Sequence, residues 1–354
     1  MNFRDKIVKW YFENKRDLPW RNSSDAYEIW VSEMILQQTR VDQGLPYYHR
    51  FLEHFPNVKS LAEASEQEVL NVWKGLGYYS RARYMHSTAR EIVAKANGVF
   101  PNNYSSLIKL KGIGSYTAAA VSSICNYEAK AAIDGNVTRV LSRYFGVTDT
   151  VGSSVLIKKI EWISNQLIPN AYPGDYNQAM MEYGALICTP KQPKCSECTV
   201  MTSCFAYNNK MTGIIPLKKK AAIKKTRYFN YLHLITESGK IILKKRTSDD
   251  IWKNLWDFPL IESDCLFEPE TTHPEFEDLL KHTIDPVLTG FCDITHILTH
   301  QALKVRFFTY RISEESEIKA ITHFELVPPN DISYPIPRLI ENFLKRNDIF
   351  FGYD

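Results

Sequence analysis

The sequence lacks a long apolar run at its N-terminus. Its first ten residues, Met-Asn-Phe-Arg-Asp-Lys-Ile-Val-Lys-Trp, carry scattered charges, whereas a signal peptide or a membrane span needs an uninterrupted apolar stretch. We therefore expect no membrane segment and a cytoplasmic protein. A large excess of one charge is also missing, because the formal net charge is only +3, which is too small to identify a binding partner by itself.

Cysteine is scarce outside one segment. Four of the seven cysteines are Cys188, Cys195, Cys198 and Cys204, and the other three are scattered. Without a secretion signal, such a cluster is more typical of metal binding than of disulfides. Only Cys195 and Cys198 form a close pair, whereas structural zinc sites usually use two close pairs. The spacing therefore favours one 4Fe-4S cluster over zinc.

The chain is long enough for about two domains. Helical spacing of apolar residues prevails through residues 1–206, which include the cysteine loop at 188–204. From about residue 227 to 354 the pattern changes to strand-type alternation with some helix. We expect an all-α domain followed by a smaller α/β (α+β) domain. The expected strands cover residues 228–236, 241–245, 288–294 and 303–312, and the expected helices 274–282 and 335–345.

A basic linker at residues 207–226 is expected to join the two domains. Six basic residues and no acidic residue lie between Pro216 and Arg227. Such a run either spans the domains as a solvated segment or helps to attract a polyanion.

The segment 107–140 contains the most specific local pattern. Gly112 and Gly114 bracket one apolar residue, between a Leu- and Lys-rich segment and a run of small residues at 117–124. Two glycines permit a tight turn, and the N–H groups that open the second helix can bind an anion. The pattern is typical of a helix-hairpin-helix that binds a DNA phosphate, with an ordinary Gly-rich connection as the alternative.

A second pair of helices is expected at residues 66–90, interrupted near Tyr78 and Tyr79. These aromatics precede Arg81 and Arg83, a combination that suits a surface in contact with nucleic acid, where rings stack or wedge. The alternative is that the tyrosines are half-buried.

Two carboxylates are candidates for chemistry. Glu33 lies at the border of an apolar helical stripe that starts at Ala26, where a carboxylate can be partly desolvated. Asp134 precedes a helical run at 137–145, so it could also be only an N-cap.

The hairpin, the aspartate about twenty residues beyond it and the cysteine loop together resemble the endonuclease III superfamily of DNA glycosylases, over residues 1–206. Bifunctional members of that superfamily carry a nucleophilic Lys after the Gly-x-Gly-x turn, where this sequence has Tyr116. Because a phenol cannot form an imine, the resemblance implies base removal without efficient strand cleavage.

Residues 18–21 (Leu-Pro-Trp-Arg) and 30–40 (Trp-Val-Ser-Glu-Met-Ile-Leu-Gln-Gln-Thr-Arg) are similar to the adenine glycosylase (MutY) family. The resemblance implies that Glu33 is the general acid that protonates the leaving adenine. Asp134 would then stabilise the positive charge that develops on the sugar, with Asn136 orienting it and Tyr116 beside the sugar. Water attack and a transient aspartyl–sugar bond both remain open.

The same resemblance implies that the target base is flipped out of the duplex. Gln38 and Tyr78 would wedge at the lesion, and Trp20, Arg21 and Gln178 would line the adenine pocket, since amide groups pair well with an adenine edge.

The second domain is similar to the Nudix-like module of that family, which recognises 8-oxoguanine. Residues 246–259 resemble its early strands, but the Arg-Glu-x-x-Glu-Glu motif of active Nudix hydrolases is absent. We expect recognition without pyrophosphatase activity. The family's Phe-Ser-His reading loop aligns with Leu298, Thr299 and His300, so the hydroxyl and the histidine are kept and the aromatic is not.

We therefore expect a monomeric, bacterial, nucleoid-associated enzyme of base excision repair that removes adenine opposite 8-oxoguanine or guanine in double-stranded DNA. Two alternatives are a bifunctional endonuclease III-like glycosylase and lyase, and a damage-binding protein without catalysis. The missing Lys at position 116 argues against the first, and the presence of both Glu33 and Asp134 argues against the second.

Overall fold

The computed structural model describes residues 2–219, 224–269, 273–313, 324–328 and 333–347. The chain forms two compact units. One comprises Met1–Ala64 and Arg83–Ala221, and the other comprises Ser65–Ala82 and Ala222–Asp354. The domain limits expected at residues 206 and 227 stay a prediction.

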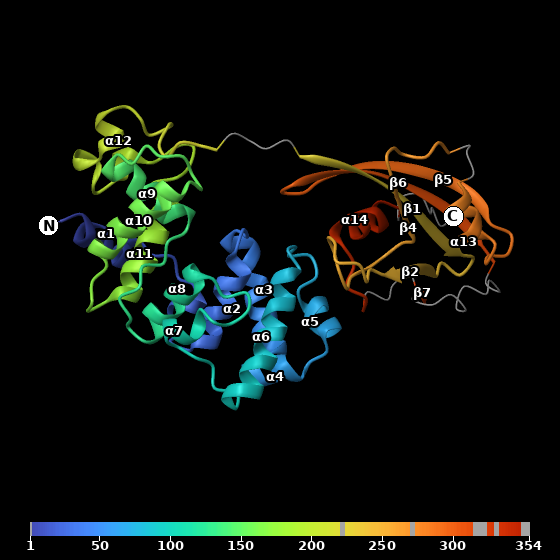
Figure 1. Ribbon diagram of the computed structural model, residues 1–354, viewed down its shortest axis with the longest axis horizontal. Helices are drawn as coiled ribbons and strands as arrows, with labels where there is room; N and C mark the ends of the chain where they lie inside the picture. Colours follow the sequence, from blue (N-terminus) through green and yellow to red (C-terminus); the bar gives the residue numbers. More distant parts are fainter. Residues whose placement is uncertain (1, 220–223, 270–272, 314–323, 329–332, 348–354) are drawn as a thin grey trace. The chain divides into compact units, whose positions relative to one another are not determined.

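The first unit is built from helices (Figure 1). Its elements are α1 (Phe3–Asn14), η1 (Pro19–Arg21), α2 (Ala26–Leu36), α3 (Val41–His54), α4 (Val58–Glu63), most of α6 (Ser80–Ala96), α7 (Tyr104–Leu107), α8 (Ser115–Cys125), α9 (Gly135–Phe145), α10 (Ser154–Leu167), α11 (Pro173–Leu186), η2 (Cys195–Glu197), η3 (Met201–Ser203) and α12 (Phe205–Asn208). Polar N-caps start many of them: Asp25 accepts hydrogen bonds from two backbone N–H groups of α2.

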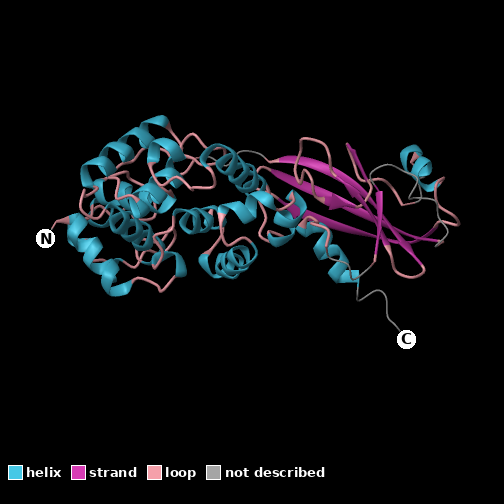
Figure 2. Cartoon of the chain, turned by 90° about the horizontal axis from the view of Figure 1, so that it is seen from below, coloured by secondary structure: helices cyan, strands magenta, loops and turns pink. Residues whose placement is uncertain are grey.

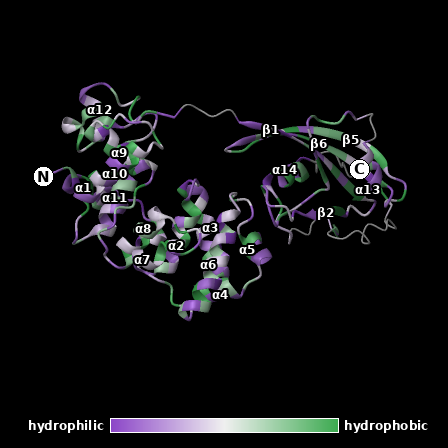
Figure 3. Ribbon diagram, in the orientation of Figure 1, coloured by the Kyte–Doolittle hydropathy of each residue, from purple (hydrophilic) through white to green (hydrophobic). Residues whose placement is uncertain are grey.

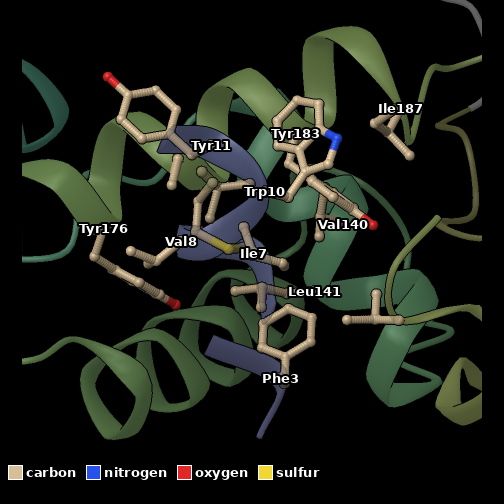
Figure 4. Packing of buried hydrophobic residues seen from close by; sticks show 14 of the residues in the cluster. Phe3, Ile7, Val8, Trp10, Tyr11, Val140, Leu141, Tyr176, Tyr183 and Ile187 are labelled. Carbon is tan, nitrogen blue, oxygen red and sulfur yellow. The ribbon is translucent and has the colours of Figure 1, made fainter. Parts of the chain in front are cut away.

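One core of this unit lies between α1, α9 and α11. Trp10 and Tyr183 meet edge to face with ring centroids 4.8 Å apart, and Ile7 and Leu141 are fully buried beside them (Figure 4). This packing fixes α9 against α11, the two helices that carry Asp134 and the segment before the cysteine loop.

The glycine hairpin is present, but its first helix is shorter than expected. Only α7, which ends at Leu107, is helical before the glycines. Ile108 is its C-cap, and residues 108–112 form turns. Gly112 has φ +79°, and a Cβ there would lie 2.6 Å from the Cβ of Tyr84. Glycine is therefore required by both the backbone and the packing of α6.

The second unit contains a seven-stranded sheet (Figure 2). Its described elements are α5 (Glu66–Val72), β1 (Lys225–Thr236), β2 (Ile241–Lys245), β3 (Trp256–Asp257), β4 (Leu260–Ser263), α13 (Pro274–Leu280), β5 (Val287–Ile297), β6 (Gln301–Ile312), β7 (Phe324–Val327) and α14 (Arg338–Asn347). The main order is β3-β2-β1-β6-β5, with β4 also paired to β1 and β7 to β2. β1 and β6 are parallel, in register from Lys225 opposite Gln301.

Both faces of the sheet are covered by apolar side chains. On one face Phe343 of α14 stacks on Phe307 of β6 with centroids 4.0 Å apart. On the other face Phe276 of α13 meets Phe308 at 5.4 Å. Hydrophobic and hydrophilic residues both occur along these strands (Figure 3), and the burial of successive residues of β5 alternates from Gly290 to Ile297.

None of the helices in the described part of the chain is long and apolar enough to cross a membrane. The expected fold class, a helical helix-hairpin-helix domain and a Nudix-like α/β domain, is confirmed. The short strands β4 and β7 were not anticipated, whereas β3 lies within residues 246–259, which resemble the early strands of the Nudix-like module.

Candidate active site and cysteine loop

Glu33 lies deeper than the sequence predicted. It is on α2, and only 9% of its surface is exposed. Burial raises the pKa of its carboxyl to about 7, a hydrogen bond from the Tyr116 hydroxyl opposes that shift, and the negative charge of Asp134 adds to it. A carboxyl in this position holds a proton at neutral pH more readily than a free glutamate does.

Tyr116, at the start of α8, lies close enough to both acids for their charges to act on its hydroxyl. Its hydroxyl donates to the sulfur of Met181 at 3.1 Å and interacts with the Glu33 carboxyl. Burial, together with the charges of Glu33 and Asp134, raises the pKa of Tyr116 well above its usual value. The phenol therefore remains neutral and acts as a donor.

Asp134 is the N-cap of α9, as the sequence allowed, and it also faces the site. One carboxylate oxygen accepts from the backbone N–H of Val137 at 2.7 Å, and the other accepts from Nδ2 of Asn136 at 2.7 Å. Burial raises the pKa of Asp134, but these donors act in the opposite direction. The structure thus brings Glu33, Tyr116, Asp134 and Asn136 together.

Arg139 joins this group to the cysteine loop. Its Nη2 donates to the Asn136 side-chain oxygen and to the carbonyl of Gly184, each at 2.8 Å, and its Nε donates to the carbonyl of Cys188 at 2.7 Å. Gly184 permits the approach, because a Cβ there would lie 2.6 Å from that of Asn136. A chain of hydrogen bonds therefore runs from Cys188 to Asp134, and nothing in the sequence pattern pointed to it.

Arg21 forms a buried ion pair that the sequence did not predict. Its Nη2 lies 2.6 Å from a carboxylate oxygen of Glu182, which is 1% exposed and also binds Arg16 at 2.6 Å. Burial alone would raise the pKa of Glu182, but the hydrogen bonds from Arg16 and Arg21 lower it to about 2. Glu182 thus fixes the direction of the Arg21 guanidinium.

The other residues expected in the adenine pocket lie on the same unit. Trp20 is buried, and its ring meets that of Tyr48 at 5.2 Å. The side-chain oxygen of Gln178, on α11, accepts from the Tyr11 hydroxyl at 3.2 Å. The amide nitrogen of Gln178 appears in none of these bonds.

Gly112 and Gly114 open the start of α8 to a ligand. Gly114 is the N-cap, and no side chain caps the helix. A Cβ at Gly114 would meet nothing within 4 Å. Backbone N–H groups at such an uncapped helix start can bind a phosphate.

The two residues expected to wedge at the lesion both have left-handed backbones. Gln38 follows α2 with φ 57°, and Tyr78 has φ 49°. Both side chains are exposed. Within the second unit, the Tyr78 hydroxyl lies 2.7 Å from the hydroxyl of Thr299, so one predicted wedge residue contacts the predicted reading residue.

Arg81 is buried, although a surface that meets nucleic acid was expected to expose it. It is 5% exposed, donates to the carbonyl of Gly77 at 3.1 Å and stacks on Trp73 at 5.1 Å. The expectation for Arg81 was wrong, because packing within the segment outweighs exposure of its charge. Tyr79 is likewise buried, while Tyr78 is exposed.

The four cysteines line one pocket, together with Arg143. Nη1 of Arg143 lies 3.4 Å from the sulfur of Cys188, and the Tyr183 hydroxyl donates to the sulfur of Cys198 at 3.2 Å. Such donors stabilise thiolates. Among the described residues, no three His, Cys, Asp or Glu side chains are arranged to hold a single metal ion. An iron–sulfur cubane makes a different demand, because each thiolate binds its own iron atom.

Comparison with known proteins defines the class. Residues 31–165 match the profile of the HhH-GPD superfamily of base excision DNA repair proteins, and residues 230–346 match that of the NUDIX domain. A solved structure described as a thermostable thymine-DNA glycosylase is 27% identical, with a TM-score of 0.53 over 58% of this chain and 95% of its own. The protein is thus a base excision DNA glycosylase with a Nudix-type second domain.

Two bacterial relatives identify the family within this class. The adenine DNA glycosylase of Buchnera aphidicola subsp. Acyrthosiphon pisum (strain APS) is 33% identical over 97% of this chain and 98% of its own length. That of Buchnera aphidicola subsp. Schizaphis graminum (strain Sg) is 38% identical over 73% and 74%. The chain belongs to the adenine DNA glycosylase family, which confirms the predicted resemblance, and DNA is its partner.

The buried state of Glu33 predicts an effect on stability. With a pKa of about 7 when folded and 4.5 as the ordinary value, Glu33 keeps its proton in the folded chain and loses it in the unfolded chain over that interval. The free energy of unfolding therefore falls as pH rises from about 4.5 to 7, by roughly 3 kcal/mol, and is level above that range. Glu33→Gln should gain stability relative to the native protein over the same interval.

Thermal unfolding at pH 4.5 to 8 measures this, with Glu53→Gln, an exposed position on α3, as the control. A difference in melting temperature between native and Glu33→Gln proteins that does not change with pH would contradict the assignment.

The hydrogen-bond chain through Arg139 predicts a loss of activity at a distance. Arg139→Gln removes the donors to Asn136 and Cys188, and a hydrogen bond to a charged group contributes about 1.5–3 kcal/mol. We expect single-turnover base release to slow roughly tenfold or more, with duplex affinity within about twofold. Lys158→Gln, at an exposed position on α10, is the control. An unchanged rate of base release in Arg139→Gln would contradict the role of Arg139 in orienting Asn136.

Proposed function

We propose that the protein is a monofunctional adenine DNA glycosylase that flips adenine out of a mispair with 8-oxoguanine or guanine and hydrolyses its N-glycosidic bond. The observation that carries this proposal is a buried Glu33 carboxyl with a pKa of about 7, hydrogen-bonded to Tyr116 and facing Asp134. Two carboxyl groups with different environments are what a glycosidic cleavage requires.

Glu33 supplies the proton. The adenine anion is a poor leaving group, so a ring nitrogen of the base must be protonated as the bond breaks. A carboxyl with a pKa of about 7 is protonated in a large fraction of molecules at neutral pH, and it still transfers the proton easily.

Asp134 stabilises the sugar. As the base leaves, positive charge develops on the deoxyribose, and an anion fixed beforehand at that point lowers the barrier. The N–H of Val137 and the amide of Asn136 hold both Asp134 oxygens, so the carboxylate is oriented before substrate binds. Either water attack or a transient bond from Asp134 to the sugar completes the reaction.

Tyr116 accounts for the monofunctional chemistry. A lyase step needs an amine that forms an imine with the opened sugar, and the neutral phenol of Tyr116 cannot do so. It instead interacts with the carboxyl of Glu33 and donates to the sulfur of Met181.

Base recognition is assigned to Trp20, Arg21 and Gln178, with Glu182 as the group that holds Arg21 in place. Trp20 offers an apolar surface, and the side-chain amide of Gln178, whose oxygen also accepts from the Tyr11 hydroxyl, suits an adenine edge. Gln38 and Tyr78 fill the space that the flipped base leaves in the stack. The start of α8 at Gly112 and Gly114 binds a backbone phosphate.

The second unit is assigned to reading the base opposite adenine. Thr299 and His300 are exposed in the turn that joins β5 to β6, where their hydroxyl and imidazole can contact a base edge. The proposal includes a monomer that acts in the cytoplasm at the bacterial nucleoid, without pyrophosphatase activity in the Nudix-like domain.

We assign one 4Fe-4S cluster to Cys188, Cys195, Cys198 and Cys204. The fit rests on four thiols that line one pocket and on the Arg143 and Tyr183 donors aimed at two of their sulfurs. When bound, the cluster fixes the loop at residues 188–204.

The proposed chemistry predicts the products of base release. With duplexes that carry adenine opposite 8-oxoguanine, the native protein should release free adenine and give strand breaks only after alkali treatment. Glu33→Gln keeps the hydrogen-bonding shape but cannot act as the acid, so single-turnover release should fall at least about a hundredfold while the duplex is still bound.

Glu53→Gln is the matched control for these rates. Strand breaks without alkali, trapped covalently by borohydride in high yield, would replace the proposal with a glycosylase and lyase. Tight binding with no adenine release by the native protein would replace it with a damage-binding protein.

The cluster assignment predicts composition and colour. Protein purified without oxygen should contain about four iron and four sulfide per chain and absorb visible light as an iron–sulfur cluster does. Cys198→Ser should lower both and expose the loop to protease. One zinc per chain, with no sulfide in the native protein, would contradict the assignment.

A further inference from the structure

The turn that carries Thr299 and His300 lies at the same edge of the sheet as the end of the basic linker. We call residues 298–300 the reading turn. β5 ends at Ile297 beside it and β6 starts at Gln301. Because β1 and β6 are parallel and Lys225 pairs with Gln301, β1 also starts at this edge. The topology thus places the residue before β1 next to the reading turn.

That residue is Lys224, and its side chain holds the turn. Its Nζ donates to the carbonyl oxygen of Leu298 at 2.7 Å. The N–H of Leu298 donates to the carbonyl of Gln301 at 2.9 Å, so both backbone groups of Leu298 are bonded. The Leu298 side chain packs against the core cluster of the sheet. Leu298 is thus anchored, while Thr299 and His300 are exposed, with the Thr299 hydroxyl 2.7 Å from that of Tyr78.

The start of β1, which supports the reading turn, is held by the contacts of Arg227. Arg227, on β1, lies 2.6 Å from both Asp250 and Glu262 and also reaches the side-chain oxygen of Gln301 at 3.4 Å. The Arg227 side chain is 9% exposed, and several strong charge-assisted bonds fix its guanidinium. Lys224 therefore connects the linker to a fixed platform rather than to a loose loop.

We propose that Lys224 is a positioning residue for discrimination between 8-oxoguanine and guanine, acting through the carbonyl of Leu298. This inference rests on the proposed function. The two bases differ only at C8 and N7, where guanine has an acceptor and 8-oxoguanine a donor at N7. A contact from Thr299 distinguishes them only if the hydroxyl is held within a narrow range of positions. Lys224 limits that range, and it joins the linker to the lesion-reading surface.

The competing explanation is that Lys224, as part of a basic run, binds a DNA phosphate. Phosphate binding and positioning of the reading turn predict different results. A lysine that neutralises a phosphate supports binding to both mispairs equally and lowers the slope of affinity against salt by about one when removed. A lysine that positions the reading turn affects only the duplex with 8-oxoguanine and leaves the salt slope unchanged.

The experiment compares Lys224→Met with the conservative Lys224→Arg and with Lys225→Met, the adjacent exposed lysine, all in the full chain. Affinity and single-turnover release are measured on duplexes with adenine opposite 8-oxoguanine and opposite guanine, at several salt concentrations. We expect Lys224→Met to reduce the preference for 8-oxoguanine about three- to tenfold, through the 8-oxoguanine duplex alone. Lys224→Arg should keep most of the preference, and Lys225→Met all of it.

Amide hydrogen exchange in peptides that span residues 296–302, without DNA, gives a second readout that does not depend on the proposed function. Exchange should become faster in Lys224→Met and stay unchanged in Lys225→Met. Unchanged exchange together with an unchanged preference overturns the role of Lys224, and so does an equal loss on both duplexes with a lower salt slope. A native protein with no preference between the duplexes overturns the proposed reading function instead, even where the exchange result shows that Lys224 holds the turn.

Discussion

The removal of the Glu33 carboxyl from water is the interaction on which the proposed chemistry depends. Each unit of pKa shift corresponds to about 1.4 kcal/mol of difference between the charged and neutral forms, so a pKa of about 7 means that the fold stores several kcal/mol at one side chain. The helical packing around α2 and α8 sustains that cost. The same burial that reduces stability at neutral pH gives the acid its proton.

The surroundings of the two acids divide their roles. At Glu33, one polar neighbour, Tyr116, opposes the rise in the pKa of the carboxyl. Asp134 has donors on both oxygens, and Arg139 supports one of those donors. Burial acts on both carboxyl groups, but hydrogen bonds compensate for it mainly at Asp134. Because Arg139 also bonds the carbonyl of Cys188, the order of the cysteine loop affects Asp134, although Asp134 does not contact the loop in these bonds.

The sequence predicted the long elements well. Strands β1, β2, β5 and β6 were expected within a few residues of their bounds, because alternation extends over enough positions to be recognised, whereas β3, β4 and β7 have two to four residues each. Glu33, Tyr116, Asp134 and Asn136 were also predicted, and the structure brings them together. Glu182, Arg139 and Lys224 were not, because their roles come from partners more than 40 positions away in the chain, and no local pattern records such contacts. The burial of Arg81 was missed for a different reason: its charge suggested exposure, although its partners Gly77 and Trp73 lie in the same segment.

The most direct test of the account is the titration of the Glu33 carboxyl itself. Infrared difference spectra between the native protein and Glu33→Gln, recorded from pH 4 to 9 without DNA, isolate the C=O stretch of a protonated carboxyl at that position. The account predicts that this band persists at pH 6 and disappears with a midpoint near pH 7. A band that is lost with a midpoint near 4.5, the ordinary value for glutamate, would show that Glu33 is ionised at neutral pH and would contradict its role as the acid.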